Sequence, residues 1–209
     1  ISIGLIYFVA AYFTKKKEIG LLAAALFAIS ITGLIFDRRL RMYAMFFPVF
    51  LAFSWMIFRF LEEEYKGKIK VARYFYEKLE INLIYLAPML VLGAISILTH
   101  QLTGNIVIIF FVYALILAVQ KYRKNESFIN KYFLGICAIV FSFILGKIFF
   151  PAQLGAYTAG IDFPNSHWSY IINVFSDYSN LILALAFLAA GVYHLYKTEN
   201  LRKESLWLS

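Results

Sequence analysis

The chain has 209 residues, of which 62% are hydrophobic and only 15% are charged, and its formal net charge is +8. A water-soluble domain is closer to half apolar and a quarter charged, so this chain has too little polar surface to cover a soluble globule. We therefore expect a single integral membrane domain, an all-α bundle of six or seven transmembrane helices. The positive charge predicts contact between the loops and anionic lipid headgroups, and no binding of nucleic acid.

Seven apolar runs follow one another along the chain and predict the membrane spans. They cover residues 1–14, 19–36, 42–60, 81–99, 106–120, 132–150 and 181–196. The first run is short for a complete crossing. In the second run, the small residues Ala24 and Ala28 let helices approach closely in lipid, so we expect them to face another membrane subunit.

The charged stretch 61–80 predicts one amphipathic helix. Apolar residues recur in it at steps of three and four, which gives the helix one apolar face. The acids Glu62–Glu64 come first and the bases follow, an order that suits the helix dipole. We expect an interfacial helix on the cytoplasmic membrane surface, with the acidic triplet as its solvated N-terminus. The same helix is a second predicted docking surface for partner subunits.

The distribution of Lys and Arg predicts the sidedness of the chain. Two long segments, 79–120 and 148–196, contain no Lys or Arg at all. Cytoplasmic loops of membrane proteins carry an excess of basic residues. This rule assigns 15–17, 61–80, 121–131 and the C-terminal tail to the cytoplasm, and 100–105 and the long loop 151–180 to the outer side.

One basic cluster disagrees with this topology. Alternating spans put Arg38, Arg39 and Arg41 on the outer side, against the charge rule. Either 19–36 does not cross fully, or the arginines have a role outside. We favour the crossing, because this run is apolar and has no Gly-Pro break.

The outer side is therefore where we expect an anion site. Guanidinium groups bind phosphate in a bidentate manner, and a lysine within a span marks a solute path or site. An aromatic residue such as Trp168 suits the headgroup level. The predicted anion-binding residues are Arg38, Arg39, Arg41, Lys147 and Trp168. The alternative is that Lys147 extends to the interface and the arginines touch lipid phosphates without specificity.

Catalytic and metal-binding residues are sparse in this sequence. His167 lies near Asp162 and Asp177 in the long loop and could form an acid–base pair with either. The alternative is a histidine hydrogen-bonded locally within the loop. With one Cys and three widely spaced His, we expect no metal site and no cofactor.

Three functions remain compatible with the sequence. The preferred one is a transport, permease or substrate-binding membrane subunit for a small or anionic solute, because the spans dominate and no reactive constellation is visible. It predicts polar residues facing one another in the bundle: Ser54, Asn82, Tyr85, Ser96, Tyr113, Gln120, Ser142 and Lys147. The alternatives are an enzyme acting on a lipid-linked or phospholipid substrate at the outer leaflet, and a structural subunit of a larger membrane complex.

Overall fold

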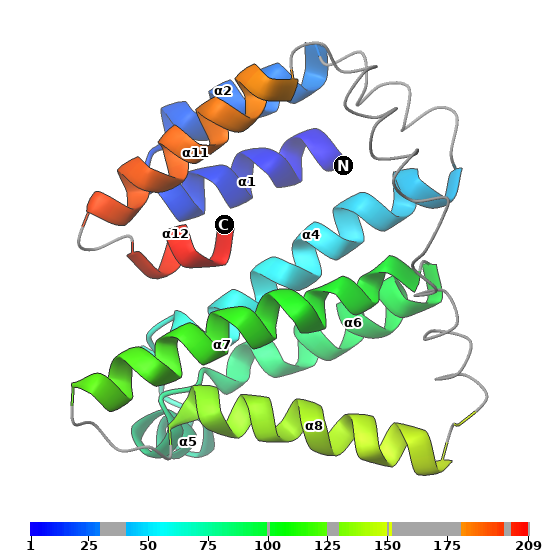
Figure 1. Ribbon diagram of the computed structural model, residues 1–209, viewed down its shortest axis with the longest axis vertical. Coiled ribbons are helices and arrows are strands. Elements are labelled where there is room, and N and C mark those ends of the chain that lie inside the picture. Colours follow the sequence, from blue (N-terminus) through cyan, green and yellow to red (C-terminus); the bar gives the residue numbers. More distant parts are fainter. Residues whose placement is uncertain are drawn as a thin grey trace. The chain divides into compact units, whose positions relative to one another are not determined.

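The computed structural model describes residues 1–29, 41–99, 101–124, 130–149, 151, 181–198 and 202–208. Within these ranges every regular element is a helix and no strand occurs. Contacts between residues divide the chain into two compact units, Ile1–Cys137 and Ala138–Ser209. The boundary between the units falls inside one helix, α8 (Figure 1).

Unit 1 contains most of the helices. They are α1 (Ser2–Thr14), α2 (Lys17–Ile29), α4 (Arg41–Glu62), α5 (Lys70–Leu79), η1 (Leu83–Tyr85), α6 (Leu86–Thr99), η2 (Gln101–Gly104), α7 (Asn105–Arg123) and the start of α8 (Lys131–Phe149). Unit 2 holds the rest of α8, with α11 (Leu181–Lys197) and α12 (Arg202–Leu208). In unit 2, the hydroxyl of Ser205 on α12 donates to the carbonyl of Val192 on α11, and Trp207 is buried.

Three of the described helices are long and apolar enough to cross a membrane. They are Met45–Glu62 within α4, Asn105–Arg123 and Lys131–Phe149. A fourth span results if α5 and the helix from Leu83 to Thr99 are taken together as one bent span. At 1.5 Å per residue, α1 reaches only about 20 Å, against a hydrocarbon core of about 30 Å. The chain thus has transmembrane-type helices, but the predicted six or seven spans are not confirmed.

The first two helices pack against each other as a hairpin (Figure 1). Lys15 ends α1 in the left-handed backbone conformation, with φ of 57°. Gly20 of α2 is buried so close to α1 that an added Cβ would lie 2.7 Å from the carbonyl oxygen of Tyr7. Ala24, one turn further along α2, is also buried. Contact of Ala24 and Ala28 with another subunit stays a prediction.

The close approach at Gly20 gives a prediction for Gly20→Ala. The added methyl group meets a backbone oxygen, which cannot rotate away, so we expect a loss of about 1–3 kcal/mol in the free energy of unfolding. Gly4→Ala is the matched control, because a Cβ at Gly4 has nothing within 4 Å. It should be neutral or add up to about 1 kcal/mol through helix propensity. Unfolding by sodium dodecyl sulfate in mixed micelles, followed by circular dichroism, measures both, and equal stability of the two variants would contradict the close packing.

A row of aromatic side chains links four helices of unit 1. Phe13 of α1 lies 4.9 Å from Phe58 of α4, measured between ring centroids. Phe58 lies 6.3 Å from Tyr113 of α7, which in turn lies 6.2 Å from Tyr132 of α8. All four side chains are almost completely buried. Burial of such rings is a large apolar contribution, and it fixes this end of the helices in place.

The predicted 61–80 helix is divided in the structure. Its first residues complete α4, and α5 begins only at Lys70. The buried side chain of Tyr65 closes the loop between them, because its hydroxyl accepts the N–H of Ile69 at 2.7 Å. The expectation that the acidic triplet forms a helix N-terminus is therefore wrong: Glu62 is the last residue of α4 and Glu63 and Glu64 follow it.

Candidate functional site

Three basic segments of unit 1 meet at one end of its helices. We name the described residues 12–17, 59–82, 121–124 and 130–132 the basic end. The hydroxyl of Tyr12 lies 3.1 Å from a carboxylate oxygen of Glu63, and Lys121 lies 3.0 Å from the carboxylate of Glu80. The charge pattern predicts that these segments share one side of the membrane, and the structure brings them together. That this side is cytoplasmic stays a prediction.

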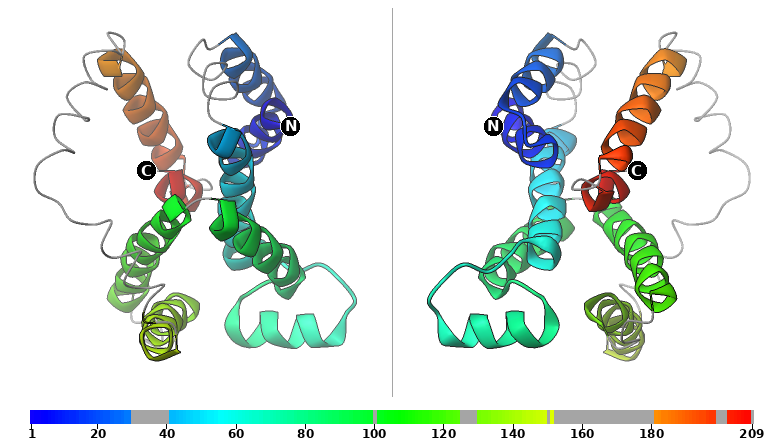
Figure 2. Two further views of the ribbon diagram at one scale, coloured as in Figure 1. Left: turned by 90° about the vertical axis from the view of Figure 1, so that its right-hand side faces the viewer. Right: turned by 90° about the vertical axis from the view of Figure 1, so that its left-hand side faces the viewer.

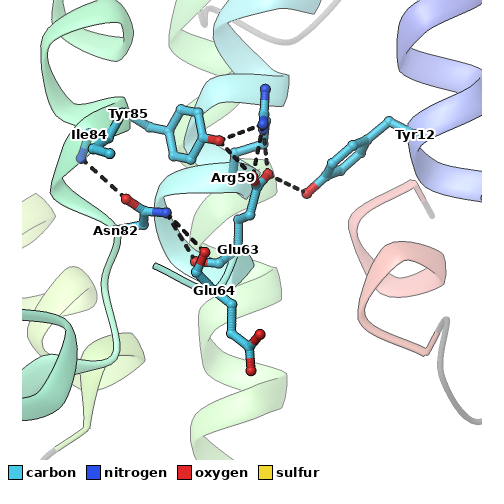
Figure 3. Close-up of polar contacts among 7 residues, drawn as sticks. All are labelled: Tyr12, Arg59, Glu63, Glu64, Asn82, Ile84 and Tyr85. Atoms are coloured by element: carbon cyan, nitrogen blue, oxygen red, sulfur yellow. Dashed lines mark hydrogen bonds and ion pairs between the residues drawn. The ribbon is translucent and has the colours of Figure 1, made fainter. Parts of the chain in front are cut away.

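Arg59 is the centre of one polar group at the basic end (Figure 3). Its Nε and Nη2 atoms donate to the two oxygens of Glu63, at 2.5 and 2.8 Å. The spacing of four residues puts these side chains on one face of the chain as it leaves α4. The same Nη2 donates to the hydroxyl of Tyr85 at 2.5 Å, and this hydroxyl donates to Glu63 at 2.6 Å. Together with Tyr12 and Trp55, these residues form what we call the Arg59 cluster.

Aromatic rings surround the guanidinium group of Arg59. Its central carbon lies 4.3 Å from the ring centroid of Tyr85, 5.2 Å from that of Trp55 and 5.4 Å from that of Tyr12. A guanidinium over an aromatic face is stabilised by the ring quadrupole. Because the rings come from α1, α4 and η1, the cluster joins three elements that are distant in sequence.

The cluster keeps Glu63 ionised. Burial by itself would raise the pKa of this carboxyl, but it accepts hydrogen bonds from Arg59, Tyr85 and Tyr12 and lies next to the guanidinium charge. The balance holds the pKa of Glu63 below its ordinary value. Glu63 follows the last residue of the span Met45–Glu62, so its charge lies at the edge of the apolar region.

Two hydrogen-bond donors in the Arg59 cluster have no protein acceptor among the described residues. The indole N–H of Trp55 is buried and has none within reach. The second terminal nitrogen of Arg59, Nη1, makes none of the hydrogen bonds described above. Nearly all buried polar groups in proteins are hydrogen-bonded, so the buried indole N–H indicates a place for an acceptor. The partly exposed Nη1 of Arg59 lies in the same cluster and can donate to the same kind of group.

A second set of polar side chains at the basic end contains a buried ion pair. The ammonium group of Lys131 lies 3.5 Å from a carboxylate oxygen of Glu62, and the two side chains are only 5% and 4% exposed. Lys131 also donates to the backbone carbonyls of Leu61 and Glu80. The hydroxyl of Tyr132 donates to the other oxygen of Glu62 at 2.7 Å. These bonds compensate two charges at a helix end where the helix dipole alone disfavours an acid.

Asn82 satisfies further backbone groups at the same place. Its backbone N–H donates to the carbonyl of Phe60 at 2.8 Å, and its side-chain amide donates to the carbonyl of Glu63 at 3.3 Å. Its side-chain oxygen accepts the N–H of Ile84 at 3.3 Å and so caps η1 (Figure 3). The last carbonyls of a helix need such outside donors, which explains why this polar side chain is buried.

Most residues predicted for the outer site lie outside the described residues. This applies to Arg38, Arg39, Asp162, His167, Trp168 and Asp177. Arg41 opens α4, but its side chain is not among those described. Lys147 lies in the last turn of α8 and is exposed. Both the outer anion site and the acid–base pair therefore stay predictions.

The polar residues predicted to face one another within the bundle are distributed unevenly. Asn82 and Tyr85 lie at the basic end, and the buried hydroxyl of Ser96 lies 2.8 Å from that of Thr103. Gln120 and Ser142 are exposed. Sequence reasoning assigned no site role to Arg59, Glu63 or Lys131. The spacing of Arg59 and Glu63 was a signal for their pairing, whereas the contacts of Lys131 depend on residues about 70 positions away.

No protein-family model, curated protein or solved structure matches this chain. In the part of the chain that the structure describes, no group of three or more His, Cys, Asp or Glu side chains could hold a metal ion.

Proposed function

We propose that the protein is a membrane subunit that binds a small anionic solute, or the anionic headgroup of a lipid, for transport or delivery, and that the Arg59 cluster receives the anionic group. The observation that carries the proposal is the pair of donors, Trp55 Nε1–H and Arg59 Nη1–H, that have no acceptor among the described residues. Donors without acceptors fit a ligand rich in acceptor oxygens, such as a phosphate or a carboxylate.

The charge around the cluster favours an anion. The ammonium group of Lys15 lies 4.3 Å from the ring centroid of Tyr12, a member of the cluster, and so adds positive charge beside it. Positive charge at the edge of an apolar region raises the local concentration of anions. The aromatic rings around Arg59 leave its side chain only about a quarter exposed, and this partial removal from water strengthens a charge-assisted hydrogen bond.

Trp55→Phe separates a binding role from a structural one. The change keeps a six-membered aromatic ring next to Arg59 and removes the five-membered ring of the indole with its N–H. Losing an unsatisfied buried donor should leave the unliganded protein equally stable or more stable, by up to about 1 kcal/mol, whereas anion affinity should fall by about tenfold. The measurement is the thermal stability of the detergent-solubilised protein as inorganic phosphate, or a short-chain phosphatidylglycerol, is added at constant ionic strength.

The arms of this titration separate the possible outcomes. Saturable stabilisation by phosphate supports a solute, and stabilisation by phosphatidylglycerol alone supports a lipid headgroup. Arg73→Lys is the control, because Arg73 is exposed and, within the described part of the chain, its guanidinium donates to the carbonyl of Gly67 and contacts no member of the Arg59 cluster. If neither probe stabilises the protein, or if Trp55→Phe and wild type respond equally, the anion site is not at the Arg59 cluster. If phosphate binds, release of trapped phosphate from proteoliposomes would indicate transport, and no release would indicate binding alone.

A further inference from the structure

Helix α5 has an apolar face that no described part of the chain covers. Val71 and Tyr74 are 62% and 58% exposed, and Phe75 is also exposed. Spacings of three and four residues put the three side chains on one face of the helix. A neighbouring face of the helix is anchored, because Ala72 is buried and Tyr76 and Leu79 are partly covered. The strip is therefore exposed although α5 itself is packed against the rest of unit 1.

The direction of α5 sets it apart from the spans. Its axis turns by 112° from that of the following helix, Leu83–Thr99, which is close to a right angle. Figure 2 shows α5 lying across one end of α6. Leu83–Thr99 includes α6, which packs against α4, and α4 contains a candidate span. If α6 follows the direction of that span, a helix nearly perpendicular to it lies nearly parallel to the membrane surface, at the level of the basic end.

Both ends of α5 are tied to the rest of unit 1. At its start, the guanidinium of Arg73 donates to the carbonyl of Gly67 at 3.2 Å, which holds the loop before it. At its end, Glu80 has the left-handed φ of 55° and its carboxylate pairs with Lys121. The carbonyl of Glu80 also accepts a hydrogen bond from the buried Lys131. These bonds hold α5, and with it the apolar strip, in a fixed position at the basic end.

Basic side chains accompany the strip: Lys70 and Arg73 lie to one side of it, and Lys78 lies one turn beyond Tyr74 and Phe75 on the same face. Lys70, Arg73 and Lys78 lie on α5 and are exposed, while Glu77 is its only acid. Lysines and arginines next to an apolar strip match the interface of a membrane, where apolar acyl chains lie beneath anionic headgroups.

We propose that α5 is an interfacial helix that seats Val71, Tyr74 and Phe75 below the headgroups of the protein's own bilayer, and that Lys70 and Lys78 select anionic lipids there. The selected lipids are those of the leaflet on the same side of the membrane as the basic end. The proposal does not depend on the function of the Arg59 cluster, because α5 shares no residue with it.

The first test measures whether lipid covers the strip. A bimane label is placed at Tyr74→Cys or, as matched control on the polar side of α5, at Glu77→Cys, in a Cys137→Ser background that removes the exposed native thiol. Both proteins are reconstituted in vesicles of phosphatidylcholine mixed with phosphatidylglycerol and quenched with the neutral quencher acrylamide. We expect the label at position 74 to be quenched much less than the label at position 77. Equal quenching at both positions would overturn the proposal.

The second test measures lipid selection. Spin-labelled phosphatidylglycerol and phosphatidylcholine report how much of each lipid the protein immobilises. We expect wild type to prefer phosphatidylglycerol, Lys70→Gln/Lys78→Gln to lose up to about fivefold of that preference per cation, and Glu77→Lys to increase it. Equal preference in all three proteins contradicts lipid selection by α5. Protection of position 74 that persists in detergent and grows with protein concentration would mean that a second copy covers the strip, which also overturns the proposal.

Discussion

Lys131→Met should destabilise the protein more than any other single change in the buried polar groups of the basic end. Methionine keeps most of the length of the side chain but removes the ammonium group that lies 3.5 Å from Glu62. The carboxylate would then stay buried without its cation, and the carbonyls of Leu61 and Glu80 would each lose a donor. Breaking a buried ion pair from one side costs about 3–5 kcal/mol. Unfolding in mixed micelles measures this loss.

A double variant tests the cause of this loss. If Glu62→Leu is added to Lys131→Met, no buried charge is left uncompensated, and most of the stability should return, because apolar replacement of a buried pair is often neutral. Lys121→Met is the matched control: its partner Glu80 is 59% exposed, so the loss should be at most about 1 kcal/mol. Additive losses at positions 62 and 131 would refute the coupling between them.

The positions of the helices could be predicted from the sequence, but the number of spans could not. Apolar runs are a local signal, and the helices α4, α7 and α8 lie where such runs occur. Whether a run crosses a membrane depends on the length of the helix it forms. The first run forms a helix of 13 residues, and its packing partner α2 is described only as far as Ile29. The single stretch 61–80 became the end of one helix, a loop and a second helix, and the loop is closed by the local hydrogen bond from the N–H of Ile69 to the hydroxyl of Tyr65.

The candidate site was harder to predict than the helices. Arg59 and Glu63 could be paired from their spacing alone. The choice of Tyr12 and Tyr85 as their partners depends on how α1 and η1 pack on α4, which no local pattern contains. Lys131 stands in a basic segment that the charge rule assigns to solvated loops. It is buried because the end of α4 offers carbonyls and a carboxylate that need a cation.

Arg59→Ala should separate α1 and η1 from α4 at the basic end. It removes two hydrogen bonds to Glu63 and one to Tyr85, together with the contacts to three aromatic faces. The side chains of Arg59 and Glu63 are about a quarter exposed, so solvent screens part of the effect. We expect a loss of about 2 kcal/mol in the free energy of unfolding. Arg73→Ala, which removes an exposed guanidinium from α5, should stay within about 0.5 kcal/mol of wild type.

Acidification should weaken the same cluster through Glu63. Because the pKa of this carboxyl is lower in the folded protein than in an unfolded chain, its ionisation adds stability at any pH above the ordinary carboxyl pKa. That contribution is lost as the pH falls from the ordinary value through the folded-state value, where the unfolded chain takes up a proton first. Glu63→Gln removes the carboxylate and its contribution to stability. The variant should therefore be less stable than wild type at neutral pH, and the difference in stability should shrink in acid. A difference that stays constant with pH would mean that Glu63 contributes by its shape and not by its charge.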